Sequence, residues 1–227
     1  MSRLFIASLA LLFFAASAGA LWVPPGGQVP VARLIENLEQ QVAATPDDPQ
    51  LLARLGRVHS MAYALGDVEL PVQGTSETPP YTYYEMGNGY PAARHSLDSA
   101  AISVRIGQLL KAMQLYEKAA GLAPGERYIW LGLGYCYDEM SHAAPILAWP
   151  TERDDAPREA IAALRVAWED KAVEAYAKAM GDAPKMDKPF LTPPVELEAG
   201  RYIQLILEPR AKRTGHEKKL MAAAKGM

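Results

Sequence analysis

The sequence has a single cysteine, Cys136, so the chain cannot form an internal disulfide. Packing alone must therefore stabilise the fold, even in an oxidising compartment. Cys136 together with His142 or His95 would be a candidate nucleophile pair. It lies between Tyr135 and Tyr137 on a predicted helix. That position favours a buried cysteine that behaves as a small hydrophobic residue.

Motifs that bind a metal or a phosphate group are missing as well. The four histidines show no HExxH or HxH spacing, and a single cysteine cannot make a CxxC pair. A zinc site assembled from distant histidines is the alternative that spacing leaves open. Gly132 and Gly134 have neither a preceding strand nor a third glycine, and no GxSxG or Walker motif occurs. We therefore expect no metal, no cofactor and no enzymatic activity.

Neither sign of charge is in large excess. There are 23 basic and 26 acidic side chains, which give a formal net charge of −3. This balance provides no general attraction for nucleic acid, so we expect no nucleic-acid partner. The end of the chain, residues 208–227, is locally basic. It either contacts an acidic partner or a membrane surface, or forms a capping helix on the last helices, which we favour.

One long apolar run occurs, at the start of the sequence. Residues 1–20 contain basic Arg3, an apolar run over residues 4–16 and small residues at 18–20. This order is typical of a secretory signal peptide that is removed after export. The alternative is a membrane anchor, but the run is shorter than the roughly 20 apolar residues that span a bilayer. We expect an extracytoplasmic protein, periplasmic or secreted, without a stable membrane anchor after cleavage.

Helical periodicity and capping residues organise the remainder, and almost nothing in it is typical of a strand. Residues 21–30 contain three prolines and two glycines and are predicted to be a linker. Two insertions are predicted, at about residues 67–95 and 141–156, the first rich in proline, glycine and tyrosine. The predicted helices cover about residues 31–44, 48–65, 96–121, 126–140, 157–180 and 195–207.

Two segments of the chain, 112–124 and 172–184, are closely similar to each other. They read AMQLYEKAAGLAP and AVEAYAKAMGDAP. Self-similarity of this kind is typical of proteins built from stacked helical units. The residues that correspond are Ala112 and Ala172, Tyr116 and Tyr176, Ala119 and Ala179, and Pro124 and Pro184.

Both segments resemble the second helix of a tetratricopeptide repeat (TPR), with a small residue, an aromatic residue four positions later and a terminal proline. The first-helix pattern of that family, W-x-x-L-G-x-x-Y, has a full copy and a weaker one. The full copy is Trp130, Leu133, Gly134 and Tyr137, and the weaker one is Leu52, Leu55 and Gly56, with His59 in place of the tyrosine. The layout is similar to that of exported bacterial proteins with such repeats.

The resemblance implies an all-α fold over residues 31–207. About three antiparallel helix hairpins would stack as a right-handed superhelix, with the two insertions as enlarged interhelical loops. Its glycines and alanines would let helices approach closely, while its aromatic residues fill the grooves between hairpins. Trp130 in particular is expected to be buried between hairpins.

The resemblance also implies where a partner would bind, because first-helix residues line the concave wall of such repeats. The candidate binding residues on that wall are Gln50, Arg57, Tyr128, Tyr135 and Asp138. The first insertion adds Tyr81, Tyr83 and Tyr84, which would present aromatic faces to a peptide or glycan, or would pack on their own repeat.

We therefore predict a scaffold or adaptor that binds a protein or peptide outside the cytoplasm. The first alternative is a peptide- or glycan-binding protein that uses the tyrosine-rich insertion. A hydrolase with its site in the insertions is the third hypothesis.

Overall fold

The computed structural model of the chain describes residues 27–65, 69–72, 99–148, 158–181, 195–210 and 214–226. Within these ranges the chain forms seven helices and two short strands. The prediction of an all-α protein is confirmed. The helices are α2 (Val31–Ala44), α3 (Pro49–Leu65), α4 (Ser99–Leu122), α5 (Arg127–Ala148), α6 (Arg158–Met180), α7 (Val195–Leu207) and α8 (Gly215–Lys225).

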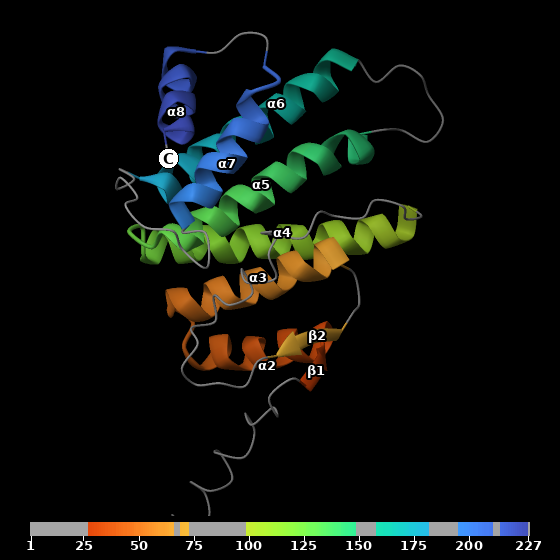
Figure 1. Cartoon of the computed structure of the whole chain (residues 1–227). Helices are drawn as coiled ribbons and strands as arrows, with labels where there is room; N and C mark the ends of the chain where they lie inside the picture. The colour runs from red at the N-terminus through yellow and green to blue at the C-terminus, as the bar shows by residue number, and fades with distance from the viewer. Residues whose placement is uncertain are drawn as a thin grey trace, which may run out of the picture.

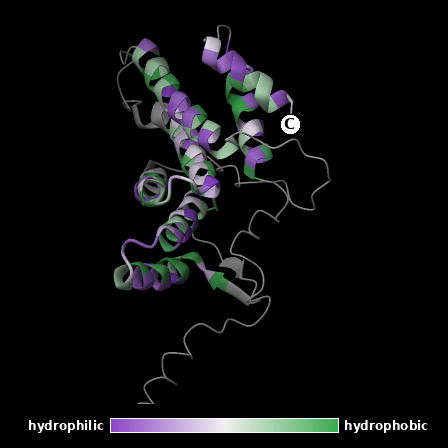
Figure 2. Cartoon of the chain, turned by 90° about the vertical axis from the view of Figure 1, so that its left-hand side faces the viewer, coloured by the Kyte–Doolittle hydropathy of each residue, from purple (hydrophilic) through white to green (hydrophobic). Residues whose placement is uncertain are grey.

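Consecutive helices pack on one another, so that they follow each other through the molecule in chain order (Figure 1). The most extensive packing is of α3 on α4 and of α5 on α6, and these two pairs meet where α4 contacts α5. Helix α7 packs on α6, and the more hydrophilic α8 lies against hydrophobic α7 (Figure 2). No described helix is both long and apolar enough to cross a membrane.

Local signals explain where several helices begin. The Asp48 side chain accepts hydrogen bonds from the backbone N–H groups of Gln50 and Leu51, at 2.8 and 3.2 Å, and so caps α3. Helix α8 begins with a capping box, in which Thr214 and Glu217 bind each other's backbone N–H groups. Such caps are local, which is why the sequence indicates the start of α3 at Asp48.

The structure differs from the sequence prediction at both insertions. Helix α5 continues to Ala148, so residues 141–148 are helical and do not belong to a loop. Strand β1 (Gly27–Pro30) lies in the predicted linker and pairs antiparallel with β2 (Glu69–Val72) of the first insertion. This pairing joins residues far apart in the sequence, and no local pattern announces it.

Close contacts between tyrosines and glycines hold neighbouring helices together. The Tyr116 ring of α4 lies between Gly56 of α3 and Gly132 of α5. A Cβ built on Gly132 would lie 2.3 Å from Tyr116 Cζ, and one on Gly134 would lie 2.5 Å from Cδ1 of Tyr176. Since van der Waals contact requires more than 3 Å, only glycine fits at these two positions of α5.

The repeat residues predicted from the sequence are mostly buried. Many of them belong to two core clusters, one formed mainly by α3, α4 and α5 and one mainly by α6, α7 and α8. Trp130 and Tyr137 are partly buried and pack against both clusters. The buried members are Leu52, Leu55, Gly56, Ala112, Tyr116, Ala119, Leu133, Gly134, Ala172, Tyr176 and Ala179. Pro124 is exposed, and Pro184 lies outside the described residues.

Trp130 is half-buried, so the expectation of an indole enclosed between hairpins is wrong. Its Nε1–H donates a hydrogen bond of 2.8 Å to the Pro124 carbonyl, which explains the six-residue spacing between the two. The Lys178 ammonium lies 4.1 Å from the centre of the ring. The indole therefore links the end of α4, the start of α5 and α6 at the edge of the core.

Two residues singled out in the sequence are fully buried. Cys136 packs in the first core cluster, as predicted, and burial raises the pKa of its thiol. His59, which stands where the predicted resemblance would place a tyrosine, has Nδ1 2.6 Å from the side-chain oxygen of Gln108. Burial lowers the pKa of His59, so the imidazole favours its neutral form between α3 and α4.

The glycine contacts give a direct stability test. We expect Gly134→Ala to lower the free energy of unfolding by about 1–3 kcal/mol, because the methyl group collides with the buried Tyr176 ring. Gly107→Ala is the matched control, since a Cβ at this position of α4 meets nothing within 4 Å. The control should gain up to ~1 kcal/mol from helix propensity. Urea unfolding measures the free energy of unfolding of both variants, and equal changes in the two would contradict the packing argument.

The position of the indole predicts a moderate cost for its removal. Trp130→Ala should lower the free energy of unfolding by about 2–3 kcal/mol, less than for a fully buried tryptophan, because part of the ring is already in water. Trp130→Phe keeps an aromatic ring but loses the hydrogen bond to Pro124 and part of the contact area of the indole, so it should cost about 1–2 kcal/mol. Equilibrium unfolding in urea checks both values, and an unchanged midpoint for Trp130→Ala would refute them.

Candidate binding cleft

A cleft of about 460 Å³ lies between α5, α6, α7 and the residues directly after α7. We call it the α5–α7 cleft. Each helix contributes one wall, and the residues at its mouth are a mixture of charged and apolar types. Its lining residues are Asp138, His142, Ala162, Arg165, Val166, Glu169, Tyr202, Leu205, Ile206, Pro209 and Arg210.

Two large apolar side chains at the cleft are exposed to solvent. Leu205 of α7 is 58% exposed and Val166 of α6 is 46% exposed, on opposite walls. Single exposed hydrophobic residues are common on proteins. Two of them facing a concave, polar-floored site are the arrangement found where a partner docks.

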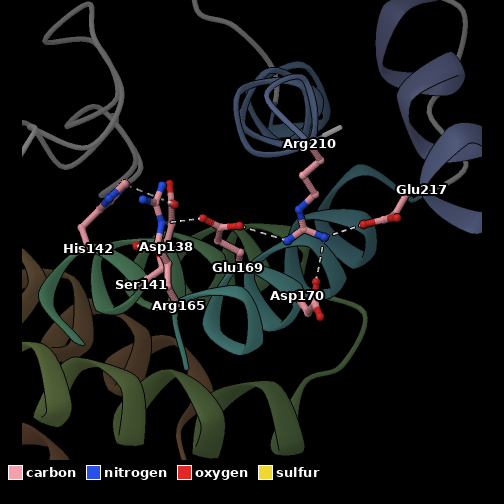
Figure 3. Close-up of polar contacts among 8 residues, drawn as sticks. All are labelled: Asp138, Ser141, His142, Arg165, Glu169, Asp170, Arg210 and Glu217. Atoms are coloured by element: carbon pink, nitrogen blue, oxygen red, sulfur yellow. Dashed lines mark hydrogen bonds and ion pairs between the residues drawn. The ribbon is translucent and has the colours of Figure 1, made fainter. Parts of the chain in front are cut away.

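Ionic contacts connect the residues of this cleft to Asp170 of α6 and Glu217 of α8, outside its lining (Figure 3). Glu169 accepts from Arg165 at 2.9 Å and from Arg210 at 3.2 Å. Arg210 also binds Asp170 at 2.8 Å, as well as Glu217 of α8. Arg210 is therefore surrounded by three carboxylates from two helices, and it holds the start of α8 against α6.

Asp138 lies at the other end of this floor, on α5, and does not share in these pairs. Among the described residues its carboxylate pairs with His142 alone, whose Nε2 is 3.7 Å away, and its side chain is 21% exposed. Burial, and then the charge of Glu169, raise the pKa of Asp138 to about 6, against the opposing effect of Arg165. Burial, followed by Arg165, lowers the pKa of His142. At neutral pH the site therefore holds an ionised carboxylate beside a neutral imidazole.

A second cleft, of about 750 Å³, lies on the far side of Arg210, between α6 and α8. It shares Val166, Glu169 and Arg210 with the first, so the two clefts are adjacent. We call it the α6–α8 cleft. The other residues lining it are Asp170, Val173, Glu174, Thr214, His216 and Glu217.

The structure does not bring the binding residues predicted from the sequence together in one site. Of these residues, Asp138 lines the α5–α7 cleft. Gln50 is exposed at the start of α3, while Arg57 and Tyr128 are half-buried. Tyr135 is 3% exposed within the first core cluster, so it offers no surface to a ligand, and its assignment to the concave wall is wrong. The tyrosines of the first insertion, Tyr81, Tyr83 and Tyr84, lie outside the described residues.

Several cleft residues were not singled out from the sequence. In the sequence, His142 is a candidate only as a partner of Cys136 or as one of the four histidines of a zinc site. The structure does not place it in one site with Cys136, which is enclosed in the core. Arg165 and Glu169 lie four residues apart on α6, a spacing that indicates a helical ion pair. Arg210 has no such local signal, because its partners come from α6 and α8.

Within the described parts of the chain, no group of three or more His, Cys, Asp or Glu side chains is placed to hold a metal ion. The chain matches no protein-family model, and no curated protein or solved structure is significantly similar to it. The interpretation of the cleft therefore depends on its own geometry and chemistry.

The raised pKa of Asp138 predicts a pH-dependent cost to stability. A carboxyl whose folded-state pKa is about 6, against a usual 3.8, favours the protonated form in the folded state. Its contribution to stability is therefore lost as the pH rises from about 4 to 7. Asp138→Asn should raise the free energy of unfolding by about 1–3 kcal/mol at pH 7.5 and by little at pH 4.

Urea unfolding of parent and variant at the two pH values measures this difference, in which the contributions of all other groups cancel. Asp47→Asn is the control, since this aspartate makes only an exposed ion pair with Lys118. It should change the free energy of unfolding by less than ~1 kcal/mol. A destabilised Asp138→Asn at pH 7.5 would show that the carboxylate is satisfied where it lies.

Proposed function

We propose that this chain is a TPR-like scaffold or adaptor that binds a peptide segment of a partner protein in the α5–α7 cleft. The observation that carries the proposal is the combination of exposed apolar side chains and a carboxylate in this cleft. Exposed Leu205 and Val166 flank a floor that contains the carboxylate of Asp138. Peptide segments present apolar and polar side chains close together, and such a surface complements them.

The proposed TPR-like arrangement is supported by the pairing of the helices. Helices α3 and α4 correspond to one hairpin and α5 and α6 to the next, with the aromatic residue of each second helix packed on glycine. The bond between Trp130 and Pro124 gives a physical role to a spacing that resembles the family pattern. Helix α7 and capping helix α8 would complete the array of about three hairpins.

The state of Asp138 supports a binding role for the cleft. An ionised carboxylate with a raised pKa lowers the free energy of unfolding, so a neutral residue at this position would make the fold more stable. Proteins keep such costly groups mainly where they interact with a ligand. We infer that a partner group meets this carboxylate.

We propose a binding protein and not an enzyme; the nucleophile pair that the sequence suggests, Cys136 with a histidine, is unsuited to catalysis. Its burial raises the pKa of the thiol, so that the reactive thiolate is disfavoured, and the sulfur is closed off from any substrate. We further propose that residues 1–20 direct export and are removed, so that the partner is met in the periplasm or beyond the cell.

Selection from a random-peptide display library tests the proposal. The full chain is expressed, purified after export and used as the target, and the enriched peptides are then titrated against variants. We expect Leu205→Gln to weaken their binding about fivefold or more, because an apolar contact with Leu205 is lost.

Leu110→Gln is the matched control, as Leu110 is an exposed leucine of α4 that is 43% accessible and does not line the cleft. It should leave binding unchanged. The absence of any enriched peptide would count against a peptide-binding function. Peptides that bind both variants like the parent would place the site elsewhere.

A further inference from the structure

The side chains that line the two clefts carry more negative than positive charge. Two arginines, Arg165 and Arg210, and two carboxylates, Asp138 and Glu169, line the α5–α7 cleft. The adjacent α6–α8 cleft adds the carboxylates of Asp170, Glu174 and Glu217. With the histidines counted as neutral, the two arginines and five carboxylates give the two clefts together a formal charge of −3. A negative potential therefore extends along α6.

The arginines are already committed to acidic partners. Glu169 binds both of them, and Arg210 also binds Asp170 and Glu217. An anionic ligand would have to break these pairs and would lie against the surplus of carboxylates. Asp138, by contrast, has a neutral imidazole as its ion-pair partner, and Arg165, which also faces it, is paired with Glu169. The carboxylate of Asp138 is therefore the place in this cleft where a cation can bind.

We propose that the α5–α7 cleft recognises a basic side chain, arginine or lysine, next to an apolar residue in the partner peptide. The cation binds Asp138, and the apolar neighbour packs against Leu205 and Val166. This inference rests on the proposed peptide-binding function and specifies its chemistry. A guanidinium forms two hydrogen bonds to a carboxylate and stacks on aromatic rings, and Tyr202 supplies a ring on the α7 wall.

The recognition also depends on pH. The charged groups that face Asp138 are His142 on its own helix, Arg165 and Glu169 on α6, and Arg210 after α7. Because protonation of Asp138 below about pH 6 removes the negative charge that binds the cation, affinity for the basic peptide falls in acid. Protonation of His142 in the same direction adds a repulsive positive charge.

Three blocked pentapeptides test the proposal, acetyl-Gly-Leu-Arg-Leu-Gly-amide and its versions with glutamine and glutamate at the centre. The full chain, purified after export and labelled with ¹⁵N, is titrated with each at pH 7.5 and pH 5, and dissociation constants are taken from amide shifts. At pH 7.5 the arginine peptide should bind about tenfold more tightly than the glutamine peptide, as a charge-assisted hydrogen bond implies. The glutamate peptide should bind most weakly.

Asp138→Asn should abolish the preference for arginine over glutamine, whereas Asp47→Asn should keep it. The arginine preference of the parent should shrink severalfold at pH 5. The proposal is overturned if arginine and glutamine peptides bind equally, if the preference survives Asp138→Asn, or if none of the three binds. Library peptides whose binding depends on Leu205 but which contain no basic residue would contradict this inference alone. They would still support the peptide-binding function.

Discussion

The packing of tyrosine rings on glycine sets the distance between the central helices. Gly134 of α5 accepts the Tyr176 ring of α6, and that ring stacks on Tyr202 of α7 with centroids 5.0 Å apart. Three helices are thereby joined through one line of contacts. A side chain at Gly134 would push α5 from α6, and because interiors are close-packed the displacement would pass to α7.

The α5–α7 cleft results from these contacts between Gly134, Tyr176 and Tyr202. Tyr202 belongs both to the stacked pair and to the cleft wall, while Leu205 lies one turn further along α7. Asp138 lies one turn beyond Gly134 on α5. The same contact that holds the helices together thus places the carboxylate of one helix opposite the apolar side chains of another.

The charged residues at the two clefts differ in how completely they are paired. Arg210 has its carboxylates from α6 and α8 in place, and with the capping box of Thr214 and Glu217 it fixes the start of the last helix. Asp138 has His142 as its ion-pair partner among the described residues, and burial raises the pKa of its carboxyl. An ionised carboxylate in that position does not add to stability at neutral pH, so we propose a binding role for it.

Most of the helices and much of the core can be predicted from the sequence, because periodicity, caps and the repeated alanines and tyrosines are local signals. Asp138 is likewise indicated, through the resemblance of α5 to a first repeat helix. Three-dimensional packing is what brings Asp138, Arg165, Glu169 and Leu205 to one cleft, and what leaves Tyr135 buried and Trp130 half-exposed. Those outcomes depend on how separate helices rotate and pack, and the pairing of β1 with β2 likewise joins distant segments. Such contacts arise from long-range packing, which no local pattern records.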